Sequence, residues 1–113
     1  MNLSKNKIIT PIKTIADYEN LKNIQFVILD CYATWCRPCK QLMKYLESIV
    51  DTYNDYDFYK VDIEELEELE DILPDTLPTV QILNYGKLIN TFTFSGKKNW
   101  NIIAEYMDYD LNK

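Results

Sequence analysis

Histidine is absent from this 113-residue sequence, glycine occurs only twice, and Arg37 is the only arginine. The lack of histidine excludes acid–base catalysis by an imidazole group. Three cysteines are present, fewer than the four Cys or His ligands that a structural zinc site usually needs, so we expect no bound metal. An odd, small number of cysteines also does not suit a disulfide-stapled secreted domain and indicates a reducing compartment.

Long apolar runs and an excess of positive charge are missing as well. No run of 18 apolar residues occurs, so we expect no transmembrane span and no membrane partner. The first 13 residues, MNLSKNKIITPIK, contain neither an apolar core nor a small-residue cleavage site, so we expect no signal peptide and a cytoplasmic location. A net charge of -6 and a pI of about 4.6 argue against nucleic acid as a partner.

The residues that are present are enough for one folded unit. With 47% hydrophobic and 13% aromatic residues, we expect residues 1–113 to form a single domain that buries its own core, as a monomer. The hydrophobic pattern predicts strands at 7–12, 24–31, 56–63, 79–84 and 87–94, and helices at 14–22, 36–53, 64–71 and 97–111. This order predicts an α/β three-layer sandwich around a mixed sheet.

Three local sequence patterns support the predicted α/β sandwich. Thr14 and Asp17 have the spacing of a capping box, which begins the first helix. The strand at 24–31 is apolar on both faces, so helices should cover both sides of the sheet. Tyr85-Gly86 is a tight turn between the last two strands, which are therefore antiparallel.

The stretch Trp35-Cys-Arg-Pro-Cys-Lys40 follows the buried strand and begins the second helix. A cysteine at the first helical turn lies among unpaired N–H groups at the positive end of the helix dipole, which favours the nucleophilic thiolate. Cys39 lies one turn further on the same side, close enough to Cys36 to form a disulfide. Pro38 suits the first turn, and Trp35 offers a flat apolar wall beside an exposed sulfur. This arrangement predicts a redox-active dithiol.

The residues from Asp30 to Lys40 resemble the active site of the thioredoxin family, usually written WCGPCK. Lys60-Val-Asp-Ile63 is similar to the third strand of that family, and Leu77-Pro-Thr79 is similar to its cis-proline loop. The resemblance extends from about residue 8 to residue 111. It implies the thioredoxin fold, with a central mixed sheet of about five strands flanked by about four helices. It also implies thiol–disulfide exchange with protein disulfides, without a cofactor.

The resemblance implies roles for the reacting residues. Cys36 would be the nucleophile and Cys39 the resolving thiol. Asp30 would accept the proton of Cys39 through water, and Lys60 would neighbour this carboxyl group. A hydrogen-bonded structural aspartate and an exposed strand lysine are the alternatives for these two residues.

The resemblance also implies a surface that binds the substrate. Pro78 would be the cis-proline that places the backbone of Leu77 beside the cysteines, where a substrate peptide can pair like an added strand. Trp35, Arg37 and Pro38 would complete this surface. Pro78 as a simple strand boundary is the alternative.

The sequence departs from the family pattern at three positions. Arg37 replaces the usual glycine, Lys44 replaces a proline, and Tyr32 replaces a tryptophan. A cation beside Cys36 should stabilise the thiolate, so we predict a redox potential less negative than about -270 mV, the thioredoxin value; a solvated arginine without effect is the alternative. Cys31 points to the other face of its strand, and we expect it to be an inert buried residue rather than a regulatory one.

Three functions are consistent with these residues. The first is a protein disulfide reductase that a flavin-containing thioredoxin reductase recharges with NADPH. The second is a disulfide oxidase or isomerase, which Arg37 favours and the missing signal peptide opposes. The third is a thioredoxin-fold binding module that does not use its dithiol for catalysis.

Overall fold

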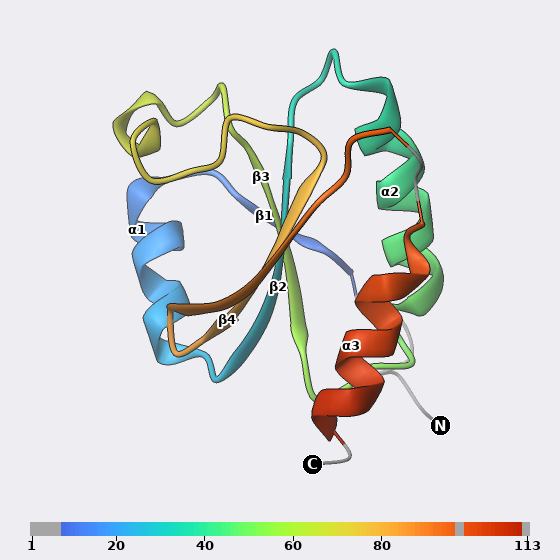
Figure 1. The fold of residues 1–113 in the computed structure, drawn as a ribbon. Coiled ribbons are helices and arrows are strands. Elements are labelled where there is room, and N and C mark those ends of the chain that lie inside the picture. The colour runs from blue at the N-terminus through green and yellow to red at the C-terminus, as the bar shows by residue number, and fades with distance from the viewer. Residues whose placement is uncertain (1–7, 97–98, 112–113) are drawn as a thin grey trace.

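The computed structural model describes residues 8–96 and 99–111 (Figure 1). In chain order, its strands, α-helices and short 3₁₀ helices (η) are β1 Thr10–Ile12, α1 Ile15–Glu19, η2 Asn20–Asn23, β2 Phe26–Tyr32, α2 Arg37–Ile49, β3 Asp57–Asp62, η3 Glu67–Leu69, β4 Thr79–Asn84, β5 Lys87–Thr93 and α3 Asn101–Leu111. The order of strands and helices is as expected except between β3 and β4, where the short turn η3 stands in place of the expected helix.

The five strands form one mixed sheet in the order β1-β3-β2-β4-β5. The pairs β1–β3 and β2–β3 are parallel, whereas β2–β4 and the hairpin β4–β5 are antiparallel. The antiparallel pairing of the last two strands is therefore confirmed. In this register, Asp30 at the centre of the sheet lies opposite Lys60 on β3 and opposite Val80 on β4.

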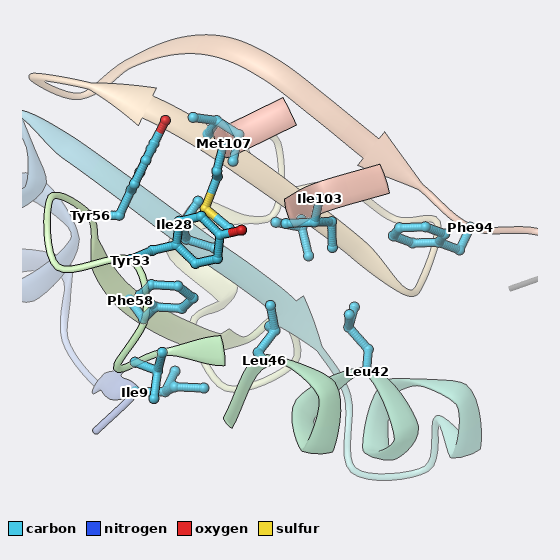
Figure 2. Close-up of a cluster of buried hydrophobic side chains, with 13 residues drawn as sticks. Ile9, Ile28, Leu42, Leu46, Tyr53, Tyr56, Phe58, Phe94, Ile103 and Met107 are labelled. Carbon is cyan, nitrogen blue, oxygen red and sulfur yellow. The ribbon is translucent and has the colours of Figure 1, made fainter. Parts of the chain in front are cut away.

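Helices cover both faces of the sheet, as the apolar run in β2 predicts. In Figure 1, α1 lies on one side of the sheet, and α2 and α3 lie together on the other. Figure 2 shows the core under α2 and α3, where Leu42, Leu46, Ile103 and Met107 meet Ile28 of β2. Leu29, the next residue of β2, belongs to a second core on the α1 side. Alternation along β2 thus supplies both cores.

The first helix begins with the predicted capping box. Thr14 Oγ1 accepts a hydrogen bond from the backbone N–H of Asp17 at 3.0 Å. The Asp17 carboxylate in turn accepts one from the N–H of Thr14 at 3.1 Å. These bonds satisfy N–H groups that have no partner within the helix. The predicted helix at 14–22 is nevertheless divided into α1 and η2, so only residues 15–19 are α-helical.

The predicted helix at 64–71 is wrong: only the 3₁₀ turn η3 forms there, so the structure has three α-helices among its described residues instead of four. The N–H of Leu69 binds the carbonyl of Leu66 at 2.9 Å, three residues back. Such a turn places side chains three residues apart on one side, and both leucines are buried. The flanking acids would repel one another in a longer α-helix.

Other boundaries differ by a few residues. Helix α2 begins at Arg37 and ends at Ile49, four residues before the predicted end. Strand β1 begins at Thr10 and includes Pro11, which suits its position at the edge of the sheet. The predicted first residue of this strand, at position 7, and the first two of the last helix, 97–98, lie outside the described residues.

Candidate active site

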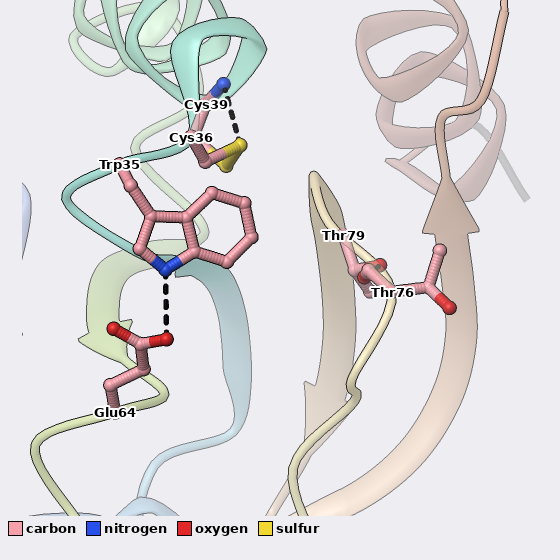
Figure 3. Close-up of a disulfide and its surroundings, with 6 residues drawn as sticks. All are labelled: Trp35, Cys36, Cys39, Glu64, Thr76 and Thr79. Carbon is pink, nitrogen blue, oxygen red and sulfur yellow. Dashed lines mark hydrogen bonds between the residues drawn. A yellow bond between two sulfur atoms is a disulfide. The ribbon is translucent and has the colours of Figure 1, made fainter.

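The helix–strand junction places both motif cysteines at the start of α2. Cys36 is the N-cap residue, and its Sγ accepts a hydrogen bond from the backbone N–H of Cys39 at 3.2 Å (Figure 3). Pro38 occupies the first turn, where its missing N–H leaves no gap in the helix. The N–H that points at Sγ would stabilise negative charge on this sulfur.

Cys36 and Cys39 form a disulfide, with their Cα atoms 5.3 Å apart. The predicted proximity of the two thiols is therefore confirmed. The expected exposure of the sulfur is wrong, because Cys36 is only 4% exposed and Cys39 2%. Ala33 is buried with them, and Tyr32 and Leu77 pack against this group. The neighbouring loops thus shield the oxidised pair.

Trp35 lies beside the disulfide and is 67% exposed. Figure 3 shows its indole Nε1–H donating to Glu64 Oε2, at 2.8 Å. This bond connects the loop before α2 to the loop after β3. The sequence analysis missed Glu64, because the two partners are 29 residues apart and no local pattern relates them.

The Leu77–Pro78 peptide bond is cis, as the resemblance predicts. The loop is held on both sides: the hydroxyl of buried Thr79 donates to the carbonyl of Thr76 (Figure 3). On the other side, the carbonyl of Pro78 accepts the N–H of Phe94 at 3.0 Å. Leu77 contacts the cluster that contains both cysteines. The structure therefore brings this loop and the disulfide together.

Asp30 is fully buried in the middle of β2. Neither of its carboxyl oxygens has a hydrogen-bond partner among the described residues. Burial raises the pKa of Asp30 to about 7, although the positive charge of Lys60 partly opposes this shift. Burial disfavours the charged carboxylate, which accounts for the direction of this shift. A carboxyl group with a pKa near neutrality can both release and accept a proton at physiological pH.

Cys31 follows Asp30 but faces the opposite side of the sheet, where it belongs to the core on the α1 side. Burial raises the pKa of its thiol well above the ordinary value. Cys31 therefore lies in a different cluster from the disulfide, and its burial favours the neutral thiol.

A cavity of about 470 Å³ opens beside Cys39, between α2 and the ends of β2 and β3. Lys40, Lys44 and Lys60 line it together with apolar side chains. Arg37 lies outside it, as the exposed first residue of α2. Within residues 8–96 and 99–111, no group of His, Cys, Asp or Glu side chains could hold a metal ion, and no helix is long and apolar enough to span a bilayer.

Comparison with known proteins identifies relatives of the whole fold. A model of the family described as Thioredoxin matches residues 12–109. Thioredoxin-1 of Saccharomyces cerevisiae is 32% identical over 82 residues, which cover 71% of this chain and 80% of that protein. Thioredoxin from Malassezia sympodialis has the same fold, with a TM-score of 0.81, 23% identity and 96% of each chain covered.

A further similar structure is a complex of ferredoxin:thioredoxin reductase and thioredoxin f2, with a TM-score of 0.77, 20% identity, and coverage of 91% of this chain and 94% of that one. Because the family model spans nearly all of the described sheet and helices, the chain belongs to the thioredoxin family of thiol–disulfide oxidoreductases.

Proposed function

We propose that residues 1–113 act as one domain that reduces disulfide bonds of other proteins through Cys36 and Cys39. The observation that carries this proposal is the position of Cys36 at the N-cap of α2, with the N–H of Cys39 3.2 Å from its sulfur. A helix N-terminus lowers the pKa of such a thiol and so supplies the nucleophile.

The exchange takes two steps, starting from the reduced protein. The thiolate of Cys36 attacks one sulfur of the substrate disulfide; a Cys36–substrate bond forms, the substrate S–S bond breaks, and one substrate thiolate leaves. Cys39 then attacks Cys36 Sγ, which forms the intramolecular disulfide and releases the second substrate thiolate. Two electrons pass to the substrate, whose thiolates take up two protons.

In this mechanism Asp30 accepts the proton of Cys39 before the second step, through water. Its raised pKa, near 7, supports this role, because a base is most effective when its pKa lies close to the working pH. Lys60, opposite Asp30 in the sheet, limits that shift by its positive charge. It would act as a positioning residue that adjusts the basicity of Asp30.

The substrate would lie across the surface around the disulfide. Exposed Trp35, together with Arg37 and Pro38 at the start of α2, would contact it on one side. The backbone of Leu77 before Pro78 would pair with it on the other side, like an added strand. The contact between Leu77 and the cysteine cluster supports this placement.

We further propose that a flavin-containing thioredoxin reductase returns the oxidised protein to the dithiol with electrons from NADPH. A reductase of protein disulfides needs a reducing compartment, so we place it in the cytoplasm, as a monomer. The second candidate is an oxidase or isomerase. The exposed cation of Arg37, next to Cys36, favours that direction because it stabilises the reduced form.

The test is insulin reduction by dithiothreitol, followed as turbidity, for the wild type and Cys36→Ser. We expect the variant to lose the catalysed rate, because it lacks the thiol at the N-cap of α2. Cys31→Ala is the matched control and should retain the rate. Equal curves for the wild type and Cys36→Ser would instead indicate a binding module. Turnover with NADPH and a reductase, compared with oxidative refolding of a reduced protein, distinguishes the reductase from the oxidase.

A further inference from the structure

The cavity beside Cys39 has a charge that contrasts with the rest of the molecule. The chain has 18 acidic side chains, 12 basic ones and a net charge of -6. Nevertheless, Lys40, Lys44 and Lys60 line this one cavity, and no acidic residue is among the described residues that line it. A hollow with cations on its walls concentrates positive potential, which attracts negatively charged groups.

The positions of the two lysines on α2 are electrostatically unfavourable for the helix itself. Lys40 and Lys44 are four residues apart, so they lie on the same face of the helix and repel each other. Lys40 also lies in the first turn of the helix, where the helix dipole favours acids over bases. The repulsion between the two lysines and the place of Lys40 in the first turn do not help the helix to form, so helix stability gives no reason for this pair of charges.

The chemistry of the wall indicates what that ligand is. Apolar side chains, including Ala33 and Met43, line the cavity together with the lysines, and Cys39 is also in its lining. A ligand that fits therefore has an apolar stem and an anionic end, and must come close to the disulfide. A glutamate or aspartate side chain has this form and charge.

We propose that this cavity is a specificity subsite that receives an acidic side chain of the protein whose disulfide is exchanged. The proposal rests on the function proposed above, because it is the substrate bonded to Cys36 that would carry the acid. Substrates with a Glu or Asp near the reacting cysteine then react faster than neutral ones. The carboxylate ends between Lys40, Lys44 and Lys60, and its stem covers the apolar wall.

Paired substrates test this. Disulfide-linked homodimers of a fluorophore-quenched peptide are made with Glu at each of the three positions on either side of the cysteine, and a matched series has Gln there. For the wild type at low salt, we expect kcat/KM for the best Glu peptide to exceed that of its Gln partner about two- to fivefold. The ratio should fall toward one as the salt concentration rises.

Lys44→Gln should lower this Glu-to-Gln ratio at least twofold. Lys87→Gln is the matched control: Lys87 begins β5 beside Asn84, which pairs with the first residue of β2, at the end of the sheet away from the disulfide. It should leave the ratio unchanged. A ratio near one at every position, or an equal loss in both variants, would overturn the proposal.

A binding measurement separates this subsite from the reductase activity. Peptides with Ser in place of Cys are titrated into the ¹⁵N-labelled oxidised protein. Shifts at the amides of Lys40, Lys44 and Lys60 with the Glu peptide, but not with the Gln peptide, support the subsite even where no peptide is reduced. Identical shifts with both peptides, or none with either, refute it.

Discussion

The carboxyl group of Asp30 connects folding to pH at the scale of a single residue. Its pKa rises from the ordinary 3.8 to about 7 because it is buried. Between these two values the unfolded chain loses the proton, whereas the folded protein keeps it. The folded state therefore binds more protons, and the free energy of unfolding falls as the pH rises through this range. The loss is complete above the folded pKa.

We predict that Asp30→Asn removes this pH dependence. The quantity to compare is the free energy of unfolding of the variant minus that of the wild type. From pH 4 to a pH above 7, this difference should shift in favour of the variant by up to about 4 kcal/mol, because each pKa unit is worth about 1.4 kcal/mol. Urea unfolding of both proteins at several pH values measures it. If the two proteins show the same dependence of unfolding free energy on pH, the carboxyl group of Asp30 does not have the raised pKa that its burial implies.

We also predict that Asp30→Asn slows the release of the substrate from the mixed disulfide, which single-turnover kinetics detects.

Arg37 affects the sulfur next to it by its charge. We predict that Arg37→Gly makes the redox potential of the Cys36–Cys39 couple more negative by about 10–20 mV, because the thiolate of the reduced form loses a nearby cation. Equilibration with a glutathione buffer measures the potential. Arg37→Lys is the control, and it should keep the wild-type value. An unchanged potential in Arg37→Gly would show that solvent screens the guanidinium.

At the scale of elements, two tyrosines in the segment between α2 and β3 bind the C-terminal half of α3. Tyr53 OH donates to Asp108 at 2.8 Å, and Tyr56 OH donates to Asp110 at 2.7 Å. Tyr56 is fully buried, and burial together with the Asp110 carboxylate raises the pKa of its hydroxyl. The hydroxyl therefore stays protonated and remains a donor. These bonds fix the C-terminal half of α3 over the core that Figure 2 shows.

Tyr56→Phe should therefore destabilise the protein by about 1–3 kcal/mol, because Asp110 loses a charge-assisted hydrogen bond. Hydrogen exchange should accelerate first in α3. Tyr85→Phe, in the exposed turn between β4 and β5, is the matched control and should have almost no effect. Equal stability of the two variants would show that packing alone holds α3.

Two segments show when the local sequence is enough to predict a helix and when it is not. Thr14 and Asp17 specify their capping box without help from the rest of the chain, and the predicted start of α1 is confirmed. The acidic run around Leu66 and Leu69 has an ambiguous spacing, because leucines three residues apart suit one turn of either helix type. Both leucines are buried against the α1 side of the sheet, and this packing selects the 3₁₀ turn.

At the scale of the whole molecule, the sheet divides the interior into two cores. Ile103 of α3 belongs to the core under α2 and α3, and Ile12 of β1 belongs to the core on the α1 side. Both are buried. The sheet between them prevents direct contact, so the two cores should respond to substitution independently.

We predict that Ile103→Val and Ile12→Val each cost about 0.5–1.5 kcal/mol. The double variant should show their sum within about 0.5 kcal/mol. Urea unfolding of the four proteins in this cycle is the measurement. A coupling energy above about 1 kcal/mol would mean that the sheet transmits strain between the cores.

The sequence by itself determined the fold family, the strand order along the chain and the Cys36–Cys39 pair, because these depend on spacing within one element or one turn. Tertiary structure alone decided that Glu64 holds Trp35 and that Cys36 is shielded. It also decided that Lys60 meets Lys40 and Lys44 around one cavity. The partners in each case come from different elements, and only packing of the helices on the sheet sets the distances between them.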